Sequence, residues 1–202
     1  MTFDPNQYKT TIRQQAEEHA GGWNAWAPLL ETWLGEATER MPDRAGAQAG
    51  SRMLDAAGAG CQSIAAGQRV GPEGSVLATD LSPAIQRQAA AAAEVDGLGN
   101  VTTCELDGQQ LHQLPGESFD AAISCVGLTY FPDRHQALTG IHHALGDGGR
   151  FASFGALHRM LGSMTATDQD SVWTEIESAW SQFETDDGFV GPCELVVAGA
   201  AG

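Results

Sequence analysis

Short apolar runs alternate with amphipathic segments along the middle of the chain, and turn-forming residues separate them. Short apolar runs predict strands, whereas apolar positions three and four residues apart predict helices. The expected strands, the first taken with its turn, are 51–61, 75–80, 100–107, 118–127 and 150–157. The helices expected between them are 62–70, 83–95 and 132–145. This order predicts a parallel sheet with helices on both faces, that is, an α/β doubly wound domain.

Two helix ends carry specific signals. Ser82 stands directly before Pro83, and a serine N-cap followed by proline at the first helical position is a common helix start. The glycine-rich segment 146–149 is expected to form a turn that ends the helix before the fifth strand.

The chain before residue 51 is expected to be helical. Residues 6–19 predict a polar helix, and residues 23–40 predict a helix with one apolar face. That face carries Trp23, Trp26, Leu30 and Trp33. It either packs against the main domain or covers a pocket as a lid. Residues 41–50 break the pattern and predict a linker, so the chain divides into a helical extension, 1–45, and a domain, 46–202.

Composition fits one α/β domain with a short extension, since the chain has 202 residues of which 42% are hydrophobic. The formal net charge of −16 repels phosphate backbones, so nucleic acid is not an expected partner. No stretch approaches the roughly 20 apolar residues of a membrane span. The polar start of the chain lacks the apolar core of a signal peptide. We therefore expect a cytoplasmic location.

The four cysteines, Cys61, Cys104, Cys125 and Cys193, form no CxxC pair. No histidine lies at a ligand-like spacing from them, so a metal site is not expected. We expect four small, buried thiols.

Three of the predicted strands end in an aspartate, namely Asp55, Asp80 and Asp107. Ligands of doubly wound sheets bind beyond the carboxyl ends of the strands. Asp80 can accept hydrogen bonds from both hydroxyls of a ribose, and Asp107 with Gly108 can face an adenine amino group. Each aspartate alone also fits a structural role in a turn or beside a helix N-terminus. Their order together favours an adenosyl ligand.

The turn after Asp55 is built of small residues, Ala57, Gly58, Ala59 and Gly60. Small residues let the backbone approach a ligand, and free N–H groups at a helix start can meet a carboxylate. A dinucleotide-binding turn has a third glycine where this chain has Ser63, and its phosphates disfavour a neighbouring carboxylate. The ammonium group of an amino acid, in contrast, is stabilised by a neighbouring carboxylate, which argues for S-adenosylmethionine over NAD. Taken alone, the segment also fits a plain strand–helix turn.

Five segments resemble, in order, the motifs of class I S-adenosylmethionine-dependent methyltransferases: RMLDAAGAGCQSIAA, GSVLATDLSP, VTTCELDGQQL, FDAAISCVGLTYFPD and ALGDGGRF. The sequence is most similar to the branch related to ubiquinone and menaquinone biosynthesis. The resemblance covers about residues 20–155, with 191–200 similar to the last strand of the family. It implies a Rossmann-like sheet of strand order 3-2-1-4-5 plus a C-terminal strand, and S-adenosylmethionine as cofactor.

The resemblance also implies a role for each motif residue. Asp55 and the turn residues would hold the methionine part, and Asp80 the ribose, with Leu81 and Ser82 beside it. Asp107 and Gly108 would face the adenine. Ser124, Cys125 and Val126 would line the reaction edge near the sulfonium. Tyr130 is the expected substrate-contacting or catalytic residue, and Trp23 and Trp26 belong to the expected lid.

The chain departs from the family pattern in three places. The family has glycine at the second, fourth and sixth positions after the acid, where this chain has Ala57, Ala59 and Cys61, as if the turn lacked one residue. The Pro-Gly-Gly before the fifth strand is replaced by Asp147-Gly148-Gly149. The stretch after the fifth strand predicts a helix at 168–184 and a strand at 193–200, so one edge strand of the sheet is expected to be missing.

The expected function is methyl transfer to a small-molecule acceptor by in-line displacement, which chiefly requires that donor and acceptor be held in line. A general base is optional. Two alternatives stay open: a non-catalytic S-adenosylmethionine-binding or scaffold protein, and, disfavoured by Asp55, an NAD-dependent oxidoreductase. A homodimer also stays open.

Overall fold

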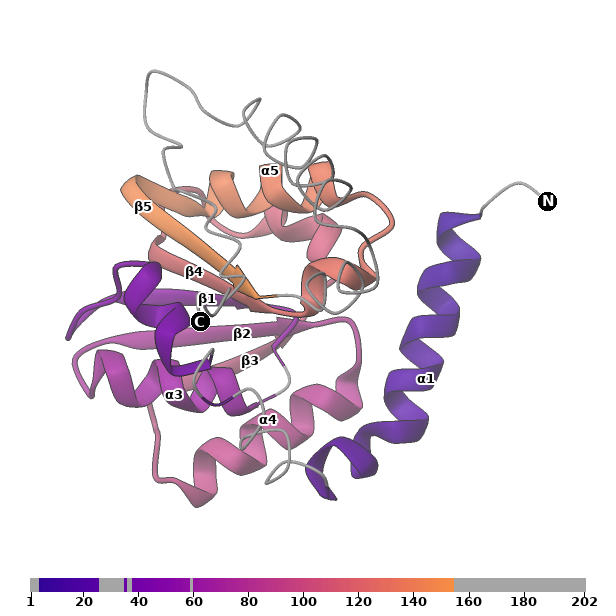
Figure 1. Cartoon of the computed structure of the whole chain (residues 1–202), viewed down its shortest axis with the longest axis horizontal. Coiled ribbons are helices and arrows are strands. Elements are labelled where there is room, and N and C mark those ends of the chain that lie inside the picture. Colours follow the sequence, from indigo (N-terminus) through magenta and orange to yellow (C-terminus); the bar gives the residue numbers. More distant parts are fainter. Residues whose placement is uncertain (1–3, 26–34, 36–37, 59, 155–202) are drawn as a thin grey trace, which may run out of the picture.

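The protein is described by a computed structural model, which covers residues 4–25, 35, 38–58 and 60–154 (Figure 1). Its centre is a parallel five-stranded sheet of order β3-β2-β1-β4-β5. The strands are β1 Arg52–Ala56, β2 Ser75–Asp80, β3 Val101–Glu105, β4 Phe119–Cys125 and β5 Leu145–Phe154. The strand order implied by the family resemblance is therefore confirmed.

Helices cover both faces of the sheet. In Figure 1, α3 and α4 lie on one face and α5 lies on the other. Their bounds are α3 Cys61–Val70, α4 Pro83–Val95 and α5 Arg134–Ala144. Two short 3₁₀ helices, η1 Gly108–Gln113 and η2 Gly127–Tyr130, follow β3 and β4; the sequence did not predict them. The layers confirm the doubly wound architecture.

The start of α4 forms as its sequence signal predicts. The Ser82 hydroxyl accepts a hydrogen bond from the backbone N–H of Ile85 at 3.4 Å, and Pro83 occupies the first helical position. The predicted ranges of β2 and α4 coincide with the observed ones, because these strand and cap signals are local.

Successive residues of β1 point to opposite faces of the sheet, as in any strand. Met53 packs in a cluster with residues of α3, whereas Leu54 packs in a cluster with residues of α5. Asp55 therefore points toward the face that α3 covers. Its carboxylate is consequently placed beneath the start of that helix.

The glycine segment 146–149 does not form the expected turn. The strand pairing begins already at Leu145, opposite Phe119, and resumes with Arg150 opposite Ala121. The extra residues form an irregularity inside β5, and Gly148 takes a left-handed φ of 73° there. Glycine tolerates this conformation without strain, so the strand continues through it.

The N-terminal elements differ from expectation. The helix α1 Pro5–Ala25 continues through Gly21 and Gly22, where a break between two helices was expected, and most of the second predicted helix, 23–40, lies outside the described residues. Residues 41–44, predicted as linker, are helical, and Met41 is fully buried against the main core. A buried methionine needs a fixed backbone, which explains why this segment is ordered as a helix. The apolar face of Trp23, Trp26, Leu30 and Trp33 falls outside the described side chains.

Residues 155–202 also lie outside the described part of the chain. They include the end of the predicted fifth strand, the helix at 168–184 and the strand at 193–200, so these predictions stay as they were. Among the helices that are described, none is both long and apolar enough to cross a membrane.

Candidate cofactor site

The carboxyl ends of the central strands are tied together by side chains. The Thr79 hydroxyl donates to the carbonyl oxygen of Asp55 at 3.3 Å, and the Ser124 hydroxyl donates to that of Ala56 at 2.8 Å. Thr79 and Ser124 are fully buried. These bonds hold β2 and β4 against the end of β1, where the predicted site residues gather.

Asp55 is fully buried, and only one of its two carboxylate oxygens has a hydrogen-bond partner among the described residues. Its Oδ2 accepts a hydrogen bond from the Ser63 hydroxyl at 2.5 Å, whereas its Oδ1 has no hydrogen-bond partner among the described residues. Burial raises the pKa of the Asp55 carboxyl to about 7, and the neighbouring charge of Asp80 raises it further, while the bond from Ser63 lowers it. An unpaired buried carboxylate oxygen strongly favours a cationic ligand group.

The raised pKa of Asp55 predicts how the stability of the ligand-free protein depends on pH. The folded protein keeps the Asp55 proton up to about pH 7, whereas the unfolded chain releases it near the ordinary value of 3.8. The unfolding free energy contributed by this group is therefore fully present below about pH 4 and is lost as the pH rises toward 7. Urea unfolding between pH 5 and pH 8 should show this loss, and Asp55→Asn should reduce it to the smaller part that comes from Asp80, whose pKa burial also raises. An equal slope in both proteins would contradict the assignment.

The turn between β1 and α3 leaves little space beside Asp55. A Cβ atom added to Gly58 would lie 2.7 Å from Cγ of Asp55 and 3.0 Å from Oγ of Ser63. The N–H of Gly58, expected to face a ligand, donates instead to the carbonyl of Thr79 at 2.9 Å. A side chain at position 58 would therefore not fit, and the N–H of Gly58 is not free for a ligand.

The turn also contains a strained alanine. Ala57 has a φ of 63° and Gly60 a φ of 119°. Gly60 tolerates its conformation, whereas an alanine in the left-handed region costs about 1–2 kcal/mol. This residue stands at the second position after the acid, where the family has glycine, so the strain follows from the altered turn.

We expect Ala57→Gly to raise the unfolding free energy by up to about 1 kcal/mol, because relief of the strain exceeds the extra entropy of a glycine in the unfolded chain. Ala90→Gly is the matched control, since Ala90 is an exposed residue inside α4. The same substitution there should lower stability by about 1 kcal/mol. Denaturant unfolding that gives both variants the same sign would show that Ala57 is not strained.

Asp80 lies at the end of β2, partly buried, and its Oδ1 accepts a hydrogen bond from the N–H of Ser82 at 2.7 Å. Burial raises its pKa to about 6, although the backbone N–H groups of Ser82 and Leu81 work in the opposite direction. Leu81 is half-buried beside it, whereas Ser82 is fully buried as the helix cap. Ser82 therefore orients Asp80 instead of facing a ligand.

Asp107 lies two residues beyond β3, and each of its carboxylate oxygens already has a partner within the protein. Its Oδ1 accepts from the N–H of Gln109 at 2.9 Å, and its Oδ2 pairs with Nζ of Lys9 at 2.5 Å. The neighbouring Gly108 is buried under the ring of Phe131, which contacts the position that a Cβ atom would take. The loops after β3 and β4 therefore meet across the end of the sheet.

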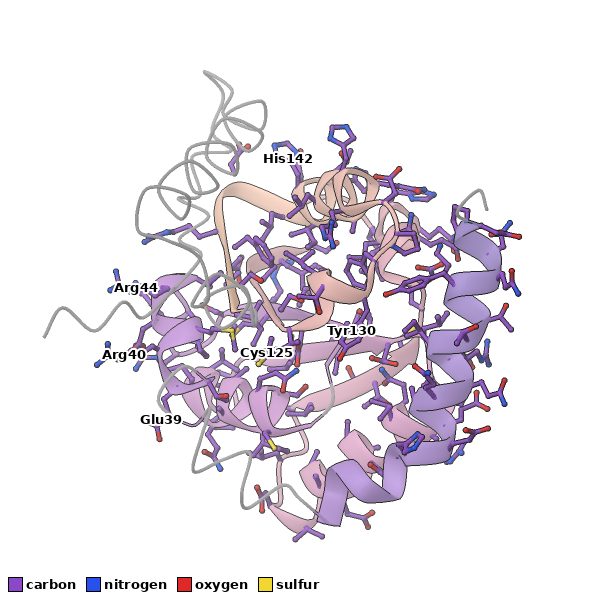
Figure 2. The ribbon with its side chains drawn as sticks, turned by 45° about the vertical axis from the view of Figure 1, so that its right-hand side comes forward. Glu39, Arg40, Arg44, Cys125, Tyr130 and His142 are labelled. Atoms are coloured by element: carbon purple, nitrogen blue, oxygen red, sulfur yellow. The ribbon has the colours of Figure 1, made fainter. Side chains whose placement is uncertain are left out.

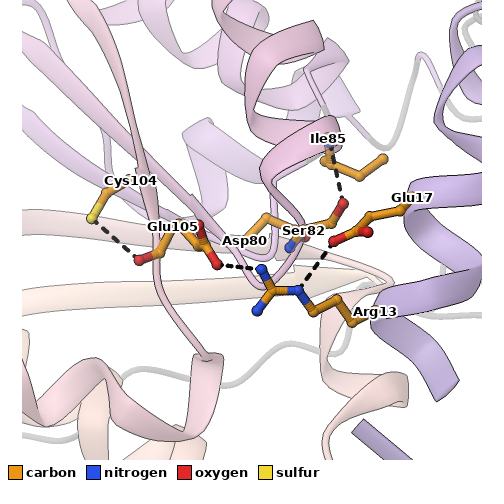
Figure 3. A network of polar contacts seen from close by, with 7 residues as sticks. All are labelled: Arg13, Glu17, Asp80, Ser82, Ile85, Cys104 and Glu105. Atoms are coloured by element: carbon orange, nitrogen blue, oxygen red, sulfur yellow. Dashed lines mark hydrogen bonds and ion pairs between the residues drawn. The ribbon is translucent and has the colours of Figure 1, made fainter. Parts of the chain in front are cut away.

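Lys9 belongs to a cationic face of α1 that sequence analysis missed. Arg13, one turn further along, pairs with Glu105 at 2.7 Å and with Glu17 at 3.1 Å (Figure 3). Figure 1 shows α1 beside the edge where the strands end. No local signal predicts the pairs of Lys9 with Asp107 and of Arg13 with Glu105, because these partners are more than 90 residues apart in sequence.

The residues expected to line the reaction edge are the last two of β4, Ser124 and Cys125, and the residue that follows, Val126. Ser124 is committed to the Ala56 carbonyl, whereas Cys125 is half-buried and burial raises its pKa to about 12, with Asp55 and Cys61 adding to the effect. The Cys125 thiol therefore stays protonated at neutral pH. Val126 adopts a left-handed φ of 63°, an unusual conformation for a β-branched residue.

Tyr130, which ends η2, is 43% exposed (Figure 2), so its ring is accessible to a substrate.

The expectation of buried thiols is wrong for Cys61, which is exposed, and Cys104 is only partly buried. Cys193 lies outside the described residues. Among the described side chains, no group of three or more histidine, cysteine or acidic residues is arranged to hold a metal ion.

These features fit S-adenosylmethionine. The unpartnered Oδ1 of Asp55 suits its ammonium. Asp80 suits the ribose hydroxyls, because a carboxylate oxygen can accept more than one hydrogen bond. Ala59 lies outside the described residues, so its place in the turn remains a prediction.

Comparison with known proteins agrees with this geometry. A family model described as a methyltransferase domain matches residues 54–149. The aklanonic acid methyltransferase DauC of Streptomyces sp. (strain C5) is 26% identical over 148 residues, which cover 73% of this chain and 66% of that protein. The chain thus spans slightly less than two thirds of this curated relative.

Solved structures share the fold. An S-adenosylmethionine-dependent methyltransferase from Aquifex aeolicus superposes with a TM-score of 0.50 at 18% identity, covering 74% of this chain and 71% of that one. The [4+2]-cyclase SpnF superposes with a TM-score of 0.53 at 24% identity, covering 57% of this chain and 42% of that one. The match of residues 54–149 to a methyltransferase domain agrees with the strand order and with the acid-ended strands of the structure, and these residues are therefore similar to the domains that use S-adenosylmethionine as cofactor.

Proposed function

We propose that the chain transfers the methyl group of S-adenosylmethionine to a small-molecule acceptor. The observation that carries the proposal is the buried Asp55 at the end of the central strand β1, whose Oδ1 has no partner among the described residues. The cofactor supplies an electrophilic methyl group on a sulfonium. Asp55 binds its ammonium, and Asp80 binds the ribose hydroxyls. Asp107 and Gly108 stand on the adenine side.

The chain contributes chiefly by orientation. Transfer from a sulfonium is an in-line displacement, and holding both reactants in line removes much of the barrier. Cys125 and Val126 line the methyl edge, and Tyr130 contacts the acceptor. A protonated Cys125 offers a neutral, weakly polar wall, so it does not compete with the acceptor as a nucleophile.

A small-molecule acceptor is supported by the name of the relative DauC, which acts on aklanonic acid. The net charge of −16 argues against a nucleic acid acceptor. The branch related to ubiquinone biosynthesis, the homodimer, the division at residue 45 and the cytoplasmic location remain predictions.

Two measurements test the proposal. Calorimetry should show binding of S-adenosylhomocysteine and none of NADH, because Asp55 repels the phosphates of a dinucleotide. Incubation of S-adenosylmethionine with a panel of aromatic acceptors should then release S-adenosylhomocysteine. Binding without release for any acceptor would favour the non-catalytic alternative, and binding of NADH alone would refute the proposal.

We also propose that α1, rather than only the tryptophan face, covers the adenine side of the site. The ion pair of Lys9 with Asp107 is the more buried of the two that α1 makes with the end of β3, its side chains being 24% and 14% exposed. Such a pair stabilises more than an exposed one. The lid is therefore held chiefly at the adenine end.

Lys9→Met should weaken S-adenosylhomocysteine binding by about threefold to tenfold, because it frees α1 and leaves Asp107 without its cation. Arg69→Met is the matched control: it removes the same charge and an exposed ion pair with Asp43, at the far end of α3. Calorimetry should leave that variant unchanged. Equal affinities for all three proteins would show that α1 is no lid.

A further inference from the structure

Gln86 is a buried polar residue that the site described above does not use. It lies in α4, is 6% exposed, and neither Nε2 nor Oε1 of its side chain has a hydrogen-bond partner among the described residues. Burying an amide without partners costs about 1–3 kcal/mol. Buried polar side chains are rarely left in this state, so each one calls for an explanation.

Gln86 lies on the buried face of α4 that packs toward the glycine turn. Ala89, on the same buried face of α4, approaches Gly60, since its Cα lies 3.8 Å from the position of a Cβ added there. Helical side chains lean toward the N-terminus of their helix. The Gln86 side chain, about one turn before Ala89, therefore leans toward the start of α4, where Ser82 orients Asp80.

One donor of the turn is already engaged. The Gly58 N–H is bonded to Thr79 and is not available to a ligand. Gln109, another buried glutamine with an unpartnered oxygen, is not comparable, because its Nε2 donates to Gln136 at 3.1 Å. Of these two amides, Gln86 is the one whose donor and acceptor both lack a partner among the described residues.

We propose that Gln86 is a further cofactor-binding residue, whose amide Nε2 donates a hydrogen bond to the carboxylate of the methionyl part of S-adenosylmethionine. A ligand zwitterion matches an amide that offers donor and acceptor together. The carboxylate at the amino-acid end is the part of the cofactor that calls for a donor, because an ionised carboxylate only accepts hydrogen bonds. The assignment rests on the proposed function and extends it.

The test is Gln86→Leu, which keeps the volume of the side chain and removes both polar atoms. Binding of S-adenosylhomocysteine should weaken roughly tenfold or more, since a hydrogen bond to a charged group is lost. Binding of 5′-methylthioadenosine, which lacks the amino acid, should stay unchanged. The melting temperature of the ligand-free variant should stay equal or rise, because no unpaired amide remains buried. Gln88→Leu, on the same helix, should change none of these.

Each outcome decides the assignment. Equal weakening for both ligands would place Gln86 on the adenosine half or give it a general structural role, and unchanged binding of both would remove it from the site. Gln86→Met serves as a second variant if leucine prevents folding, and the same two-ligand comparison applies. A natural chain that binds neither ligand would instead refute the proposed function.

Discussion

Asp55→Asn is expected to weaken S-adenosylhomocysteine binding by roughly 100-fold at pH 8 and, at the same pH, to stabilise the ligand-free protein. The amide keeps an oxygen for the Ser63 hydroxyl, which now donates to Oδ2 of Asp55 at 2.5 Å. It removes the negative charge that an ammonium would meet. Burial raises the pKa of Asp55 to about 7, so the ionised form is the one that the empty site disfavours.

The two effects have opposite signs, which makes the prediction specific. A residue that only supports the fold would lower both stability and affinity. Calorimetry gives the affinity and urea unfolding gives the stability. Affinity in the natural protein should also rise from pH 5 to pH 8, as Asp55 and Asp80 ionise, and the Asp55→Asn variant should show a smaller rise.

Asp120→Asn is the matched control. It removes the same charge from a half-exposed aspartate of β4 that pairs with Arg52 at 3.1 Å. Arg52 and Asp120 lie at the amino-terminal ends of β1 and β4, whereas the site lies at the carboxyl ends of the strands. Neither the affinity for S-adenosylhomocysteine nor its pH dependence should therefore change. Weaker binding in this control as well would mean that net charge, rather than Asp55, sets the affinity.

Asp80→Ala should weaken the binding of S-adenosylhomocysteine by about 1–3 kcal/mol, which is roughly fivefold to 150-fold. Asp80 lies where the ribose of an adenosyl ligand is expected, and its carboxylate is held in place by the N–H of Ser82 at 2.7 Å. Adenosine should lose affinity by the same factor, because it carries the same ribose. Calorimetry with both ligands measures this.

Asp80→Asn separates the ribose contact from the helix contact. Asparagine keeps an acceptor for Ser82 and loses only the charge, so it should bind adenosine with an affinity between that of the natural chain and that of Asp80→Ala. If alanine and asparagine leave adenosine binding unaltered, the ribose lies elsewhere. This result would leave the role of Asp55 open to its own test.

The sequence by itself determined the order of the elements, several of their bounds and the kind of site. The strand Ser75–Asp80 and the helix Pro83–Val95 match their predicted ranges, because alternation, the Ser82 cap and Pro83 act within a few residues. The acid-ended strands predicted the edge of the sheet where the site lies, because parallel strands end on one side.

Tertiary structure alone decided which groups are left without partners and which are taken. The free Oδ1 of Asp55, the engaged N–H of Gly58 and the buried amide of Gln86 depend on how α3 and α4 pack on the sheet. The pair of Lys9 and Asp107 joins residues 98 positions apart. Burial and long-range pairing arise only when distant segments meet in space, so a local pattern predicts which residues reach the site but not which hydrogen bonds they keep for a ligand.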